Sequence, residues 1–168
     1  RRFMGFLPSS NKELPPTRKS EDPNDRLEFS LDTLIPENQN KPYDMKELIT
    51  KVVDDRDFFE TQPDYAANII TGFARMSGAP IGVVANQPMV LAGCLDNNSS
   101  RTAARFVRFC ACFTIPIVPF VDVPVFLPGT SPAYNGLITH VAKLLFAFAD
   151  ATVPNLPIIP IPAYGCAS

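Results

Sequence analysis

The sequence has few of the features that mark nucleic-acid-binding or membrane proteins. Its 168 residues carry a net charge of −2, and no stretch collects Lys and Arg, so nucleic acid and anionic membranes are not expected partners. No apolar run approaches the roughly 18 residues that a membrane helix needs. The N-terminus lacks an initiator Met and reaches Pro8 too soon for a signal peptide. These features predict a piece from the middle of a longer protein.

Cysteine and histidine are also too few, or wrongly spaced, to predict a metal site. None of the four cysteines forms a C-x-x-C pair, and Cys110 and Cys112 lie two apart on a predicted helix, where they face different directions. We expect free core thiols in a reducing compartment. The single histidine, His140, has no Cys, Asp or Glu at ligand spacing, which favours a structural or surface role. No metal is therefore expected in this chain. The other two cysteines are Cys94 and Cys166.

Apolar residues are abundant, and so is proline. Hydrophobic residues make up 46% and charged residues 19% of the chain, as expected for a globular domain with a core. Many of the 18 prolines fall between Pro8 and Pro42, a polar stretch that predicts an extended linker on the surface, after a possible helix end at Arg1–Leu7. Five apolar side chains are expected to hold the linker down: Leu27, Phe29, Leu31, Leu34 and Ile35.

The first half of the chain predicts one helix and a hairpin. Apolar residues recur at helical spacing from Met45 to Val53, after a capping box of Asp44 and Glu47. Residues 58–60 are expected to be extended. Two strands, Ile69–Met76 and Ile81–Ala85, flank a Ser77-Gly78 hairpin turn.

The second half alternates strand and helix. The predicted order is a helix 101–113 capped by residues 98–100, a strand 115–122, a loop 123–135, a helix 136–151 and a strand 156–161. This order implies parallel strands joined by right-handed crossovers. The loops 123–135 and 164–167 should therefore share the sheet edge where α/β folds bind ligands. The predicted inward residues are Ala103, Phe106, Val107, Cys110 and Phe113 on the first helix, opposite Arg101, Arg105 and Arg108, and Leu137, Val141, Leu144, Leu145 and Phe148 on the second.

Ordered motifs run through essentially the whole chain. They are Leu31-Asp-Thr-Leu-Ile-Pro36, Pro42-Tyr-Asp-Met45, Asn68-Ile-Ile-Thr-Gly-Phe-Ala-Arg75, Gly82-Val-Val-Ala-Asn-Gln-Pro88, Ala92-Gly-Cys-Leu-Asp96, Ser99-Ser100, Ala103-Ala-Arg-Phe-Val-Arg-Phe-Cys110, Phe126-Leu-Pro-Gly-Thr130, Ala142-Lys-Leu-Leu145 and Ala151-Thr-Val-Pro154. Together they resemble the carboxyltransferase (beta) subunits of biotin-dependent acyl-CoA carboxylases, most of all the propionyl-CoA type.

The resemblance implies an α/β fold of the crotonase-like ββα superhelix type, present here as a partial domain. Residues 1–22 would end an N-terminal domain, 23–42 would be the interdomain linker, and 43–168 would begin a truncated C-terminal domain. The implied reaction moves a carboxyl group from carboxybiotin to the α carbon of an acyl-CoA. Biotin would be carried by a biotin carboxylase and carrier alpha subunit, and the beta subunits would form a hexamer. The implied location is the bacterial cytoplasm or the mitochondrial matrix.

The resemblance also implies the site residues. Backbone N–H groups of Cys166 and Ala167 match an oxyanion hole on the biotin side, because both the ureido nitrogen and the enolate spread charge onto oxygen. Tyr65, Asn68 and Asn86 lie in the stretch that the family uses around acyl-CoA, although packing or hairpin roles fit them equally well, and the two asparagines also fit a role in satisfying turn backbone groups. Asp122 is a candidate for orienting the loop that follows it, with a structural cap as the alternative. The matched substrate-binding positions are Val125, Phe126, Leu127, Pro128, Gly129, Tyr134, Tyr65 and Asn86.

The chain departs from the family mainly after residue 110. Prolines 119, 157, 160 and 162 are each expected to remove a donor from a parallel strand. Three explanations remain open: an inactive homologue that keeps only an assembly surface, a deliberate variant, and errors in reading the parent DNA, which the single-base character of many changes favours. The departures are Ala111 for an acid, Val125 and Val141 for Gly, Pro132-Ala133 for Gln-Glu, Thr139 for Arg, Pro160-Ile161-Pro162 for Thr-Arg-Lys, and Cys166 and Ser168 for Gly and Tyr.

Overall fold

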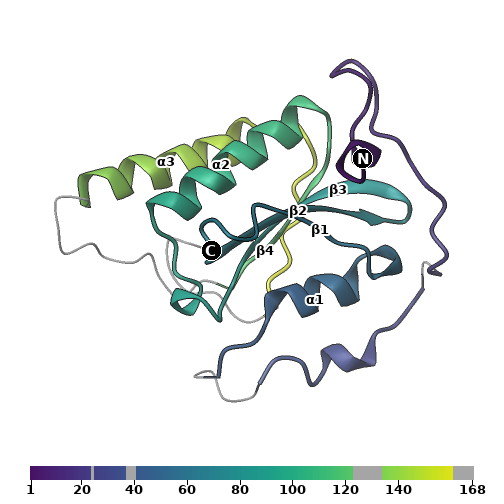
Figure 1. The fold of residues 1–168 in the computed structure, drawn as a ribbon, viewed down its shortest axis with the longest axis horizontal. Helices are drawn as coiled ribbons and strands as arrows, with labels where there is room; N and C mark the ends of the chain where they lie inside the picture. Colours follow the sequence, from purple (N-terminus) through teal and green to yellow (C-terminus); the bar gives the residue numbers. More distant parts are fainter. Residues whose placement is uncertain (24, 37–40, 123–133, 161–168) are drawn as a thin grey trace.

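A mixed four-stranded sheet organises the part of the chain that the computed structural model describes, namely residues 1–23, 25–36, 41–122 and 134–160, with side chains from residue 139 onward in the last range. The strand order is β1-β2-β3-β4 (Figure 1), with antiparallel pairs β1/β2 and β2/β3 and a parallel pair β3/β4. The parallel pair confirms the predicted crossover. The strands are β1 Phe59–Thr61, β2 Ile69–Met76, β3 Ala79–Asn86 and β4 Ile117–Phe120.

The β2–β3 hairpin turns at Ser77-Gly78, as the sequence predicts. Both residues have positive φ, 50° and 81°, as a two-residue turn of the primed type requires. A side chain at Gly78 would place its Cβ 2.1 Å from the carbonyl oxygen of Arg18, so only glycine fits. The Asp54 carboxylate accepts the N–H groups of Ser77 and Gly78 at 3.0 and 2.7 Å. The turn is therefore held by both the linker and the segment after the first helix.

The sheet separates two apolar cores because successive strand residues face opposite sides. Helices α2 (Asn97–Cys112) and α3 (Tyr134–Asp150) lie side by side on one face, and α1 (Met45–Val52) covers the other (Figure 1). Phe73 packs toward α2 and α3, whereas its neighbour Ala74 packs toward α1. The α2–α3 core also takes Phe6, Val84, Phe106, Val107, Cys110, Ile117, Leu144 and Ala147, and the α1 core takes Met45, Ile49, Val53, Ile70, Val83, Val118 and Phe120.

Both N-caps are aspartates. Asp44 caps α1 by accepting the N–H of Lys46 at 3.0 Å, but Glu47 forms an ion pair with Lys51, so the predicted capping box is only half formed. The complete box lies at α2, where Asp96 and Ser99 exchange bonds of 2.8 Å. The sequence predicted residues 98–100 as the cap of a helix from 101, but α2 begins at Asn97 and its N-cap is Asp96, so of the predicted residues only Ser99 takes part in the box.

Helix α3 faces the core with Leu144 and Phe148, as predicted, and the structure selects Leu144 over the alternative Leu145. It begins at Tyr134 rather than Gly136. Leu144 is 8% exposed, but Leu145 is 58% exposed, and Ala147 supplies the next buried contact. Residues 144–149 are all apolar, so the sequence pattern could not choose between Leu144 and Leu145. Leu137 is among the residues whose side chains are not described.

The strand predicted at 156–161 is not formed over the residues described; isolated parallel bridges connect Ile117 with Asn155 and Phe120 with Ile158. Leu156 and Ile158 donate to β4 at 3.0 and 2.7 Å, so the nitrogen of Pro157 faces away from β4 and removes no bond from this ladder. Pro119, in contrast, lies between the two bridges and has no N–H to donate to the carbonyl oxygen of Leu156. The ladder is interrupted at this proline.

The linker is held mainly by polar contacts. The Arg26 guanidinium donates to the carbonyl oxygens at the end of α1, from Lys51, Val52 and Val53, at 2.9, 3.5 and 3.2 Å. Three of the five predicted apolar anchors, Leu31, Leu34 and Ile35, pack against the α1 core. The other two, Leu27 and Phe29, are exposed, so that part of the prediction was wrong. At the chain start, a 3-10 turn (Phe3–Phe6) buries Phe6.

Candidate functional site

Buried polar side chains gather where β3 and β4 end. Asn68, Asn86 and Gln87 are each at most 5% exposed, although amides are normally found in water. In open α/β sheets, ligands bind beyond the carboxyl ends of the parallel strands, which here is the end marked by Asn86 and Phe120. We call the residues that join the segments at this end the edge cluster: Tyr43, Asn68, Asn86, Gln87, Gly93 and Asp122.

Two asparagines of the edge cluster hold the loop that follows β3. The Asn86 amide donates to the carbonyl oxygen of Gly93 at 3.1 Å, and the Asn68 amide donates to that of Cys94 at 2.9 Å. Within this loop, Leu91, Ala92 and Gly93 have φ of 50°, 52° and 75°. Non-glycine residues seldom adopt this region, and the surrounding bonds must stabilise it. The loop therefore has one defined shape.

Gln87 ties the same loop to the start of α1. Its side-chain nitrogen donates to the Asp44 carboxylate at 2.7 Å, while its oxygen accepts the N–H groups of Met45 and Met89 at 3.3 and 3.4 Å. Both polar atoms of this buried amide thus have partners, as burial demands.

Asp122, two residues after β4, contacts both the segment before α1 and the loop after β3. Its carboxylate accepts the hydroxyl of Tyr43 at 2.8 Å, and its carbonyl oxygen lies so close to Gly93 that a Cβ there would be 2.9 Å away. Burial, reinforced by the hydrogen bond and charge of Asp122, raises the pKa of Tyr43 well above its ordinary value. Tyr43 therefore stays protonated and keeps donating at any physiological pH.

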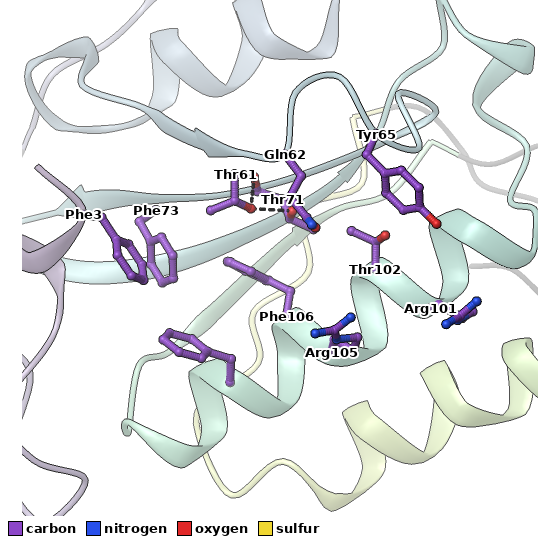
Figure 2. Close-up of a pocket in the computed structure, with 11 residues that line it drawn as sticks. Phe3, Thr61, Gln62, Tyr65, Thr71, Phe73, Arg101, Thr102, Arg105 and Phe106 are labelled. Carbon is purple, nitrogen blue, oxygen red and sulfur yellow. Dashed lines mark hydrogen bonds between the residues drawn. The ribbon is translucent and has the colours of Figure 1, made fainter.

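A separate pocket of about 270 Å³ opens between β1, β2 and α2 (Figure 2). Phe73 and Phe106 line it with apolar surface, and Arg101 and Arg105 extend from α2 beside it. Tyr65 lies at this pocket, 48% exposed. Within the described residues, no group of three or more His, Cys, Asp and Glu side chains could hold a metal ion, and no helix is long and apolar enough to cross a membrane.

The structure places the predicted site residues in different surroundings. Asn86 is buried in the edge cluster, and Tyr65 lies at the pocket instead, so the two do not meet in one cavity. Tyr134 is the first residue of α3, and its side chain is not described. The remaining predicted positions lie outside the described residues: Val125, Phe126, Leu127, Pro128, Gly129, Cys166 and Ala167.

The sequence did not predict the contact of Tyr43 with Asp122, because 79 residues separate them. Asp122 could be noticed as an acid at a strand end, but nothing local marks Tyr43 as its donor. Gly93 carried a clearer signal, since glycine adopts positive φ readily, although the residues around it are apolar.

The sheet, its crossover helix and the edge cluster define a crotonase-like α/β domain, and the comparisons confirm that fold class. Residues 1–168 match the family model of the carboxyl transferase domain, and the chain belongs to that family. It is 62% identical over 98% of its length to the propionyl-CoA carboxylase beta chain of Cereibacter sphaeroides, covering 32% of that protein. It is 55% identical to the human mitochondrial propionyl-CoA carboxylase beta chain, covering 98% of this chain and 31% of that one.

The solved structures agree with the sequence relatives. Transcarboxylase 12S, solved as a hexamer with methylmalonyl-coenzyme A and methylmalonic acid bound, superposes with a TM-score of 0.90 at 42% identity, over 94% of this chain and 30% of that one. The beta subunit of geranyl-CoA carboxylase from P. aeruginosa gives a TM-score of 0.72 at 26% identity, over 94% and 29%. The chain thus spans about a third of the length of the relatives it matches.

Proposed function

We propose that this chain is part of the carboxyltransferase subunit of a biotin-dependent acyl-CoA carboxylase of the propionyl-CoA type. The proposed reaction transfers the carboxyl group of carboxybiotin to the α carbon of propionyl-CoA, or of a related short acyl-CoA, and gives methylmalonyl-CoA. The observation that carries this proposal is the 62% identity to a propionyl-CoA carboxylase beta chain over 98% of this chain. The superposition on transcarboxylase 12S, a structure with methylmalonyl-coenzyme A bound, supports the same substrate class.

The proposed partners follow from the family. Biotin arrives as a carboxylated substrate on a partner alpha subunit, and the beta subunits form a hexamer. Residues 1–22 end the N-terminal domain, 23–42 link the domains, and 43–168 begin the C-terminal domain. Relatives in bacteria and mitochondria fit a location in the bacterial cytoplasm or the mitochondrial matrix.

The proposed chemistry relies on backbone donors. Carboxybiotin supplies the carboxyl group, and negative charge develops on the ureido oxygen of biotin and on the thioester oxygen of the acyl-CoA. The N–H groups of Cys166 and Ala167 are the proposed donors on the biotin side, and residues 125–129, Tyr134, Tyr65 and Asn86 are the proposed substrate-binding positions. The proposed role of the described residues is to hold the sheet edge in one position. Backbone donors must themselves be held in place in order to stabilise the developing charge.

The departures from the family favour a second candidate, a fragment that assembles without turnover. Val125 and Cys166 replace glycines in loops that must approach substrate closely, and Pro119 interrupts the pairing of β4 with residues 155–158. This candidate predicts normal subunit assembly and no carboxyl transfer.

A pair of chimeric enzymes separates the two candidates. In the full-length C. sphaeroides beta chain, the matching 165 residues are replaced by this chain, once unchanged and once with Val125→Gly, Thr139→Arg, Val141→Gly and Cys166→Gly. Both are assembled with the alpha subunit and assayed with propionyl-CoA and radiolabelled bicarbonate. We expect the restored chimera to transfer carboxyl at least about tenfold faster than the unchanged one, because side chains at positions where backbone must approach substrate displace the reacting groups, and a misplacement of about 1 Å can cost up to a hundredfold in rate.

The control is an alpha subunit without any beta chain, which sets the background rate. Two assembled hexamers with no transfer above that background would reject the proposed function and support the assembly fragment. The isolated 168 residues should show no turnover, since the family site needs parts outside this chain; measurable turnover would contradict that expectation.

A further inference from the structure

Tyr43 makes a contact that its packing alone does not explain. Its ring is 7% exposed and packs in the core beneath α1, as a phenylalanine ring could. Its hydroxyl, however, donates to the Asp122 carboxylate at 2.8 Å. A hydrogen bond to a charged acceptor is among the stronger ones that a protein makes, and it has a defined direction. The hydroxyl therefore fixes the position of Tyr43 relative to Asp122, which packing of the ring alone does not do.

The backbone of Tyr43 is itself fixed at the sheet edge. The next residue, Asp44, caps α1 and accepts the side-chain amide of Gln87 at 2.7 Å. The N–H of Gln87 in turn donates to the carbonyl oxygen of Asn68 at 3.1 Å. The residue next to Tyr43 is thus bonded to Gln87, directly after β3, and Gln87 is bonded to Asn68, directly before β2.

Asp122 is held on its other side by the loop after β3. Its carbonyl oxygen contacts Gly93, where even a Cβ would be only 2.9 Å away, and Gly93 is held by the Asn86 amide at 3.1 Å. The carboxylate of Asp122 is therefore bonded to the segment before α1, and its carbonyl oxygen packs closely against the loop after β3. Asp122 also lies three residues before Val125, the first of the predicted substrate-binding positions 125–129.

We propose that Tyr43 and Asp122 form a positioning pair that sets the direction in which the chain leaves β4. This inference rests on the proposed function, because the direction affects carboxyl transfer only if the residues that follow Asp122 bind substrate. Neither residue acts on substrate: Tyr43 is buried, and the Asp122 carboxylate is engaged by Tyr43. Their effect reaches the reaction through the backbone, where a displacement of about 1 Å can reduce a rate by up to a hundredfold.

The test uses the full-length restored chimera assembled with its alpha subunit. Tyr43→Phe keeps the ring and removes only the hydroxyl. We expect kcat to fall about tenfold while KM for propionyl-CoA stays within about twofold, since alignment for transfer is lost before binding is. Asp122→Ala should behave in the same way, and Asp122→Asn, which keeps an oxygen that can accept the Tyr43 hydroxyl, should recover most of the rate.

Thr50→Val is the matched control, because it also removes one hydroxyl hydrogen bond, to the carbonyl oxygen of Lys46 within α1, away from the sheet edge. It should leave kcat and KM unchanged. Hydrogen exchange on the same proteins gives a readout that needs no turnover. Tyr43→Phe should speed exchange at least about fivefold in peptides covering 88–95 and 117–122, and Thr50→Val should not.

The outcomes separate the two proposals. A restored chimera that assembles without transfer contradicts the proposed function, and exchange still decides whether the pair holds the edge. Unchanged exchange in Tyr43→Phe overturns the positioning pair. Faster exchange with an unchanged kcat in an active chimera also overturns it, because the bond would then stabilise the fold without aligning the site.

Discussion

Gly82 and Cys110 should show a strong energetic coupling that reports how closely α2 packs on the sheet. Gly82 lies in β3, between Phe73 on β2 and Ile117 on β4. A Cβ at Gly82 would be 2.5 Å from the Sγ of Cys110 and 3.2 Å from the Cε1 of Phe106. Gly82→Ala therefore pushes against the helix, and Cys110→Ala removes the atom that it meets first.

The magnitudes follow from that geometry. The Cβ–Sγ distance is about 1 Å below an ordinary van der Waals contact, and inserting a methyl group into a packed core typically costs about 1–3 kcal/mol. Cys110→Ala deletes one buried sulfur and leaves a small cavity, at about 1–2 kcal/mol. In the double variant the new methyl fills the vacated space, so its loss should be about 1 kcal/mol, well below the sum of the single losses. The coupling should be at least about 1 kcal/mol.

Urea unfolding of the four proteins, followed by circular dichroism at 222 nm, measures this cycle. Gly5→Ala serves as the control, because the nearest atom to a Cβ there is the end of the Arg75 side chain at 3.9 Å. It should change the free energy of unfolding by less than about 0.5 kcal/mol. Additive losses in the double variant would refute the reasoning, since they would show that the added methyl does not meet the sulfur.

Three further predictions concern the linker and the thiols. Arg26→Met should lower the free energy of unfolding by about 1–2 kcal/mol, because three carbonyl oxygens at the end of α1 lose a charged donor. Arg108→Met, on the exposed face of α2, should change it by less than about 0.5 kcal/mol. Equal effects of the two substitutions in urea unfolding would contradict the capping role of Arg26. Burial raises the pKa of Cys110 to about 12, so iodoacetamide at pH 8–10 should label the exposed Cys112 and spare Cys110, as peptide mass spectrometry would show. Above about pH 8.5 the unfolded chain releases the Cys110 proton while the folded chain keeps it, so stability should fall with rising pH, and less steeply in Cys110→Ala; an equal slope, or equal labelling of the two thiols, would contradict this.

Local pattern was enough to predict the elements whose faces differ clearly in polarity. The spacing of Met45, Leu48 and Ile49 predicted α1 in this way. The hairpin was predicted instead from its Ser77-Gly78 turn between two apolar runs, which the structure buries on both faces. The pattern was insufficient for α3, where Leu144 and Leu145 are equally apolar and only contact with α2 selects one of them. The Asp96–Ser99 box was present in the sequence as an acid three residues before a hydroxyl, but the adjacent serines also fitted a cap.

The sequence by itself determined the family, the order of the helices and strands, and the alternation that places a parallel strand after α2, since these depend on residues near one another in the chain or on ordered motifs. Only the tertiary structure decided which partners the polar groups find. Arg26 meets α1, Tyr43 meets Asp122, and the nitrogen of Pro157 faces away from β4, whereas Pro119 lacks the donor that would face Leu156. The physical reason is the same in each case: a buried polar group must be satisfied by whichever group the fold brings within about 3 Å, and sequence spacing does not encode that distance.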